Sequence, residues 1–246
     1  YCIQTDNKAL LHGYRLAKLR HIKDNADFSN KHPESVMSIA QLEFVERTTS
    51  DNPTHVIIWL HGLGADGFDF EAIVPELKLP ASCNYRFIFP HAPFQRITVN
   101  KDKVMRAWFD IRDPAIDKQP DIEDINDSTN AVIGMIEQQI ETGIDASNIV
   151  IADFSQGGAI ALNAGLRYHT KLAGIMALST YLPLHDVFPE MSHDENRSTP
   201  IFMAHGTADD VISYMIAEKS HTKLESMGYP VDWHSYELAH GVGPDE

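Results

Sequence analysis

Short apolar runs alternate along this chain with longer amphipathic stretches. The apolar runs lie at 55–60, 85–90, 148–153, 172–178, 200–205 and 231–237. Runs that are apolar at almost every position are typical of strands buried on both faces, as in a parallel sheet. The stretches between them predict helices at about 67–77, 123–142, 155–168 and 210–227. This alternation predicts an α/β fold, in which helices cover both faces of a mostly parallel central sheet.

The 246 residues are expected to form one large domain with an extension in front of it. Residues 37–246 hold all the predicted strands, the first of which, at 37–46, alternates more and is expected to be more exposed. Residues 1–36 are expected to be a helical extension packed on the main domain. Within the extension, residues 8–23 are basic and amphipathic. This segment fits a helix packed on an acidic domain or a helix lying on an anionic membrane surface.

The charge balance bears on possible partners. The chain has 20 basic and 35 acidic residues, a formal net charge of −15, which repels phosphate backbones and argues against nucleic acid. Two cysteines, Cys2 and Cys83, do not make a disulfide framework, which favours a reducing compartment. No apolar run approaches the roughly 18 residues of a membrane span, and the first residues do not resemble a secretion signal. We therefore expect a cytoplasmic protein, and the sequence predicts no oligomeric state.

The segment "IADFSQGG" (151–158) reads as a strand that turns sharply into a helix at Ser155. Such a turn exposes a hydroxyl and places the next backbone N–H at a helix N-terminus, as a nucleophilic serine requires. The usual pattern is G-x-S-x-G. Gly157 supplies the second glycine, but Asp153 stands where the first should be. A serine that only caps the helix is the alternative.

Two later segments offer the other groups that a nucleophilic serine needs. In "IFMAHGTADDVI" (201–212), Asp209 follows a predicted strand, and its neighbour Asp210 could be mistaken for it. Either carboxylate could instead cap the next helix. His240 follows the last predicted strand in a glycine-rich loop. The order Ser155, Asp209, His240, each after a separate strand, is that of the α/β-hydrolase fold and predicts a Ser-His-Asp triad.

An early glycine-rich loop completes the predicted site. "WLHGLGADG" (59–67) leaves a strand where such a fold takes its second oxyanion donor. We expect the backbone N–H groups of Leu63 and Gln156 to form the oxyanion hole, although an ordinary tight turn is the alternative. The histidines in 184–195 match no zinc pattern and no nucleotide-binding signature is present, so no metal or cofactor is expected.

Seven segments together carry a resemblance to a known family. They are "VIIWLHGLGADG", "FIFPHAP", "AWFDI", "GIDASNIVIADFSQGGAIAL", "LAGIMALSTYLP", "HGTADDVI" and "YELAHGVGPDE". Over about residues 55–246 the chain resembles the acyl-protein thioesterase, carboxylesterase and lysophospholipase family of α/β hydrolases. The resemblance implies hydrolysis of carboxylic esters or thioesters through an acyl-enzyme, acting on a small-molecule or acylated substrate. All three activities named in the family fit the sequence.

The resemblance also implies roles for individual residues. Ser155 would be the nucleophile, His240 the base and Asp209 the acid that orients it. Leu63 and Gln156 would donate to the oxyanion. Pro90 and Trp108 would line the acyl or leaving-group side, although Trp108 fits the core equally well.

The chain departs from the family pattern in three places. Asp153 replaces the elbow glycine, and a buried carboxylate must be paired, protonated or exposed. We expect it to find a hydrogen-bonding partner and to be tolerated; the alternative is a catalytically impaired binding protein. The N-terminal extension is longer than the family's usual one, and the closing helix after His240 is missing from the sequence.

Overall fold

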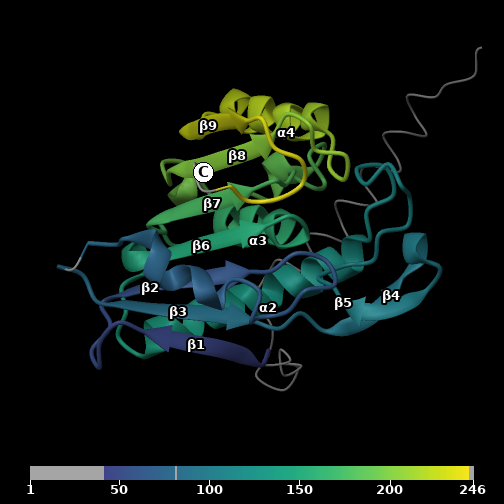
Figure 1. Cartoon of the computed structure of the whole chain (residues 1–246). Coiled ribbons are helices and arrows are strands. Elements are labelled where there is room, and N and C mark those ends of the chain that lie inside the picture. Colours follow the sequence, from purple (N-terminus) through teal and green to yellow (C-terminus); the bar gives the residue numbers. More distant parts are fainter. Residues whose placement is uncertain (1–41, 81, 244–246) are drawn as a thin grey trace, which may run out of the picture.

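The computed structural model describes residues 42–80 and 82–243, which form a central seven-stranded sheet with helices packed against it (Figure 1). The strand order is β1-β3-β2-β6-β7-β8-β9, and only β1 is antiparallel to its neighbour. The predicted α/β architecture is therefore confirmed. The strands are β1 (Phe44–Thr48), β2 (His55–Leu60), β3 (Tyr85–Pro90), β6 (Ile149–Phe154), β7 (Gly174–Leu178), β8 (Ile201–Gly206) and β9 (Val231–Tyr236).

Strand β2 shows how the apolar runs produce this sheet. Val56, Ile58 and Leu60 point into one apolar cluster, and Trp59 points into another with Ile57 packed against it. Because successive side chains of a strand alternate between faces, a strand buried on both sides needs apolar residues at almost every position. The runs read from the sequence and the strands agree to within two residues for β2, β3 and β6 to β9.

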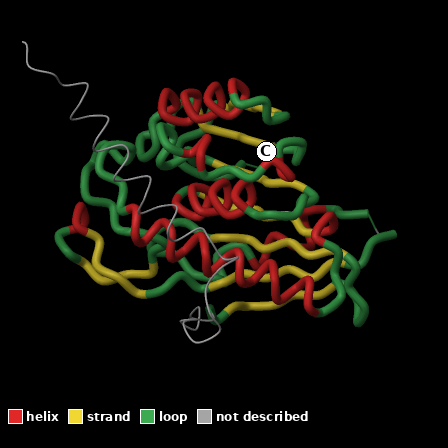
Figure 2. Tube along the Cα trace, turned by 180° about the vertical axis from the view of Figure 1, so that it is seen from behind, coloured by secondary structure: helices red, strands yellow, loops and turns green. Residues whose placement is uncertain are grey.

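Helices cover both faces of the sheet, but unequally. Seen from behind, α2 (Ile122–Glu141), α3 (Gln156–Arg167) and α4 (Tyr214–Ser226) lie across one face (Figure 2). The other face carries the 3-10 helix η1 (Glu71–Leu77) over β2 and β3. The sequence predicted a longer helix there; Pro75 lies inside it and has no N–H for the helical ladder. Among the described helices, none is long and apolar enough to cross a membrane.

Two other differences concern short strands. The expected strand at 37–46 is observed as the edge strand β1, and residues 37–41 lie outside the described part, as do the extension 1–36 and its basic segment 8–23. A hairpin of β4 (Phe94–Ile97) and β5 (Lys103–Arg106) was not predicted. Its strands have four residues each and mix charged with apolar side chains, so they lack the continuous apolar runs that mark the central strands.

Candidate active site

The turn between β6 and α3 is a strained elbow centred on Ser155. The backbone of Ser155 has φ 57° and ψ −120°, a conformation that residues other than glycine rarely adopt. Its N–H donates to the carbonyl of Leu178 on β7 at 2.9 Å, which ties the elbow to the neighbouring strand. The strand–turn–helix expected from the sequence is therefore present, and the serine is its turning point.

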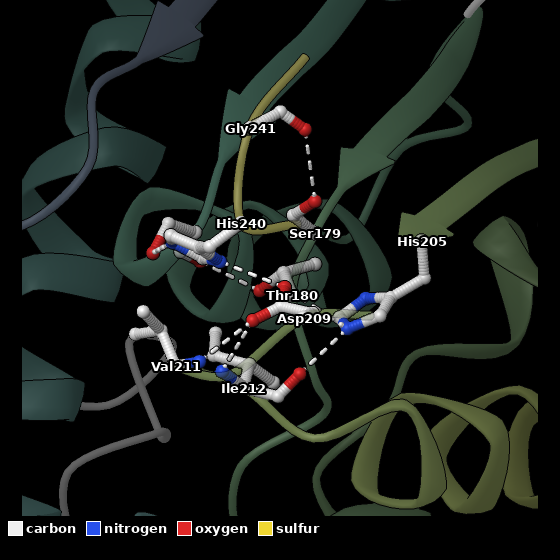
Figure 3. A network of polar contacts seen from close by, with 9 residues as sticks. Ser179, Thr180, His205, Asp209, Val211, Ile212, His240 and Gly241 are labelled. Carbon is white, nitrogen blue, oxygen red and sulfur yellow. Dashed lines mark hydrogen bonds and ion pairs between the residues drawn. The ribbon is translucent and has the colours of Figure 1, made fainter. Parts of the chain in front are cut away.

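Ser155, His240 and Asp209 form a hydrogen-bonded chain, whose His240–Asp209 part is seen from close by in Figure 3. His240 Nε2 lies 2.8 Å from Ser155 Oγ, and His240 Nδ1 lies 2.8 Å from Asp209 Oδ2. Because a carboxylate accepts, the ring proton belongs on Nδ1 and leaves Nε2 free to take a proton from the serine hydroxyl. Asp210, the neighbouring residue that the sequence could not separate from Asp209 as the acid, is exposed. This is the geometry that activates a serine hydroxyl.

Asp209 is held in place by the turn that follows it. Its Oδ1 accepts hydrogen bonds from the backbone N–H groups of Val211 and Ile212 at 2.9 and 2.8 Å. The side chain of Asp209 is fully buried. Asp209 therefore does not cap α4, whose N-cap is Ser213. One of its carboxylate oxygens closes the turn before that helix, and the other faces the imidazole of His240.

The dipeptide Ser179–Thr180 after β7 holds the Ser155 elbow and the His240 loop together. Thr180 Oγ1 donates to the carbonyl of Ser155 at 2.7 Å. Ser179 Oγ donates to the carbonyl of Gly241 at 3.3 Å (Figure 3). Ser179 also has a left-handed backbone, with φ 47°. The sequence gave no role to these two residues, because they bond to segments distant in the chain.

The predicted oxyanion donors lie on segments that meet closely. Leu63 follows β2 in the loop, and Gln156 opens α3. A Cβ on Gly157 would lie 2.7 Å from the carbonyl oxygens of both Leu60 and His61, so the first turn of α3 packs directly on the end of β2. Only a glycine allows the loop and the helix N-terminus to approach this closely.

Trp108 supports this loop from inside the molecule. Its indole N–H donates to the carbonyl of His61 at 2.8 Å, and the side chain of Gln156 bonds its backbone N–H and the carbonyl of Phe109 at 2.9 and 2.7 Å. Trp108 is 0% exposed and Pro90, at the end of β3, is buried. The structure favours the core alternative for Trp108, which supports the loop after β2 from inside the molecule. Substrate contact by Pro90 stays a prediction.

The phospholipase/carboxylesterase family model matches residues 41–246, which is most of the chain. The chain belongs to this family. By this membership it is a carboxylic ester hydrolase with the α/β-hydrolase fold, and the resemblance found in the sequence is confirmed.

Individual family members are similar to it over most of their length. Acyl-protein thioesterase 1 from Yarrowia lipolytica is 37% identical over 198 residues, which cover 78% of this chain and 87% of the relative. Acyl-protein thioesterase 1 from Neurospora crassa is 39% identical over 193 residues, with 74% and 78% covered. Among solved structures, SOBER1 from Arabidopsis thaliana has 31% identity and a TM-score of 0.73, with 78% of this chain and 92% of that chain covered.

Asp153 stands where the G-x-S-x-G pattern has its first glycine. It is 0% exposed, and its Oδ1 accepts the N–H of Leu178 at 3.3 Å. The expected hydrogen bond therefore exists, but Oδ2 has no partner among the described residues. The carboxylate is accommodated because residue 158 of α3 is glycine: a Cβ there would collide with Asp153 Oδ1 and with the side chain of Thr180.

Burial raises the pKa of Asp153 well above its usual value, and the Leu178 N–H only partly opposes this. The unfolded chain releases the Asp153 proton near the usual pKa of 3.8, whereas the folded protein keeps that proton to higher pH. The contribution of Asp153 to stability is therefore fully present below that value and is lost as pH rises through the folded-state pKa.

We expect Asp153→Gly to raise kcat several-fold, with little loss of stability, because it removes a side chain wedged between β6 and α3. Asp153→Asn keeps the shape and removes the ionisation. The free energy of unfolding, measured in urea, should therefore be higher for Asp153→Asn than for the parent protein. This difference should grow between pH 4 and pH 8. A lower kcat in the glycine variant would mean that Asp153 contributes to the site.

His61 anchors the loop after β2 through a neutral ring. Its Nδ1 donates to the carbonyl of Gly62 at 2.7 Å, and its Nε2 accepts the N–H of Ala92 at 3.1 Å. Burial lowers the pKa of His61 from 6.5 to about 4. Protonation would place a proton on Nε2 facing the Ala92 N–H, so the loop keeps its anchor only while the ring is neutral.

The pKa of His61 predicts a loss of stability in acid. Because the folded-state pKa is depressed, the contribution is complete above pH 6.5 and is lost as pH falls toward 4. At pH 7 the free energy of unfolding should be higher for the parent protein than for His61→Gln. We expect this difference to fall by roughly 2–3 kcal/mol between pH 7 and pH 4.5, because each pH unit below the unfolded-state pKa removes about 1.4 kcal/mol. Urea unfolding at both pH values measures it. His234→Gln, at an exposed histidine, is the control, and an unchanged advantage would contradict the assignment.

Proposed function

We propose that this chain hydrolyses carboxylic esters and thioesters with Ser155 as nucleophile, His240 as general base and Asp209 as the orienting carboxylate. The observation that carries the proposal is the pair of 2.8 Å contacts that link the three side chains through His240. Family membership supports the reaction class, and the strained elbow at Ser155 supports the choice of nucleophile. No cofactor enters the proposed reaction.

The proposed reaction has two halves. His240 Nε2 takes the hydroxyl proton as Ser155 Oγ attacks the acyl carbonyl, and the negative oxygen of the tetrahedral intermediate accepts from the N–H groups of Leu63 and Gln156. The C–O or C–S bond then breaks, and the leaving group takes the proton from His240. Water repeats the sequence on the acyl-enzyme, releasing a carboxylic acid and free Ser155.

For the substrate, we propose an acylated polypeptide thioester, with small neutral esters as alternatives. The support is that two relatives at 37% and 39% identity are named acyl-protein thioesterase. The net charge of −15 disfavours strongly anionic acyl groups at long range. A catalytically impaired binding protein is the rival function, and the buried, half-satisfied Asp153 is the observation in its favour.

A fluorophosphonate probe tests the proposal. We expect it to label Ser155 alone, and peptide mapping to locate the label. Ser155→Ala should abolish labelling without a large fall in Tm, and Ser226→Ala, at an exposed serine of α4, should label as the parent does. A label on another serine would overturn the proposed mechanism with Ser155 as nucleophile, and no label on folded protein would favour the rival.

A further inference from the structure

A second histidine contacts Asp209, across from His240 (Figure 3). His205 lies on β8 and is 1% exposed. Its Nε2 lies 2.8 Å from the carbonyl oxygen of Ile212 and 3.3 Å from Asp209 Oδ2. The reaction proposed above gives this buried imidazole no part.

The surroundings fix which nitrogen of His205 carries the proton. Both neighbours of Nε2 are acceptors, so Nε2 carries it and divides its hydrogen bond between the Ile212 carbonyl and Asp209. Nδ1 is then unprotonated and carries a lone pair, which has no hydrogen-bonding partner within the described part of the chain. Burial lowers the pKa of His205, which keeps the ring neutral.

His205 completes the donors around Asp209. Oδ1 accepts two backbone N–H groups from the following turn, and Oδ2 receives His240 Nδ1 at 2.8 Å and His205 Nε2 at 3.3 Å. The Nε2–H group of His205 also donates to the carbonyl oxygen of Ile212. The backbone N–H of Ile212 in turn donates to Asp209 Oδ1. One imidazole therefore fixes both the carboxylate and the turn that supports it.

We infer that His205 is a positioning residue, which holds Asp209 Oδ2 in line with His240. This inference rests on the proposed function, because it assigns His205 to the same triad. A neutral donor suits the position: a cation would compete with the His240 imidazolium for Asp209, and an apolar side chain would leave Oδ2 and the Ile212 carbonyl without this donor. Tyr214 meets the ring edge-on, with centroids 6.3 Å apart.

Two amide variants separate this role from a packing role. The side-chain nitrogen of glutamine reaches the place of Nε2, whereas that of asparagine reaches only the place of Nδ1. We expect His205→Asn to lower kcat about 10–100-fold with little change in KM, because small misplacements of a catalytic group cost rates of this order. His205→Gln should stay within about 3-fold of the parent, since the Nε2 donor is restored. His234→Asn, at the exposed His234–Asp232 pair of β9, is the matched control.

The pH dependence of kcat/KM and the proton NMR spectrum are two measurements that a packing defect alone would leave unchanged. His205 and His240 share Asp209 Oδ2, so loss of the His205 donor changes how the carboxylate acts on His240. The acid limb of kcat/KM should therefore move in His205→Asn and stay in place in His205→Gln. The low-field proton resonance of His240 Nδ1–H should likewise shift in His205→Asn and stay in place in His205→Gln. Thermal unfolding checks the fold, and His205→Phe replaces the asparagine variant if that one unfolds.

The outcomes separate the inference from the proposed function. A His205→Asn variant with parent kcat, or one with reduced kcat but an unmoved acid limb and resonance, overturns the positioning role. If the parent hydrolyses no ester while the resonance still shifts in His205→Asn alone, the contact stands and the proposed function fails.

Discussion

Asp209→Asn is expected to lower kcat by up to about 10⁴-fold and to leave KM nearly unchanged. The two backbone N–H groups on Oδ1 decide how the amide sits: its oxygen stays with them, and its NH₂ group faces His240. His240 Nδ1 must then accept, so the ring proton moves to Nε2. That nitrogen can no longer take the proton of Ser155, and the nucleophile is lost although the fold remains.

Asp210→Asn is the matched control, since it makes the same change one residue away on an exposed side chain. We expect its kcat to stay within about 2-fold of the parent, as is usual for exposed surface positions. Steady-state hydrolysis of a p-nitrophenyl acyl ester measures both variants, with Tm as the check on folding. Equal losses in the two would show that the orienting acid is not Asp209.

Gly157→Ala is expected to lower kcat at least about 10²-fold. The added Cβ would lie 2.7 Å from two backbone carbonyl oxygens, those of Leu60 and His61, and neither can rotate away as a side chain could. The first turn of α3 must therefore move off the end of β2. That movement separates the N–H groups proposed for the oxyanion, and a shift of about 1 Å costs a rate factor of this order.

Gly174→Ala adds the same methyl group to β7, where its nearest neighbour would be the carbonyl oxygen of Pro200 at an ordinary 3.5 Å. We expect this control to keep the parent kcat. Burst kinetics with an activated ester measure acylation directly in both variants. Parent-like acylation in Gly157→Ala would mean that the close approach of helix and loop does not set the oxyanion geometry.

The sequence by itself determined the layer architecture and the places where chemistry would lie. The continuous apolar runs specify buried strands because every side chain of such a strand meets a helix layer or a neighbouring core. The elbow at Ser155, the turn at Asp209 and the loop at His240 are each encoded within a few residues. Local patterns of this kind can be read without knowing what lies next to them in space.

Which side chains meet was decided by the tertiary structure alone. Ser155 and His240 are 85 residues apart, and the order of the parallel strands brings them together. The same order brings Asp209 and not Asp210 to His240, buries Trp108 beneath the loop after β2 and places His205 against the carboxylate. Nothing local to His205 distinguishes it from the other histidines of the chain.

Asp153 shows the limit most clearly. The sequence correctly indicated that an aspartate at the elbow needs a hydrogen bond, because a buried carboxylate without one is costly. Whether the elbow could keep its shape depended on the space opposite, and that space exists because Gly158 of α3 has no Cβ to fill it. The free energy needed to bury a carboxylate follows from its own chemistry. Whether neighbouring residues accommodate and hydrogen-bond it depends on the tertiary structure, which alone specifies those neighbours.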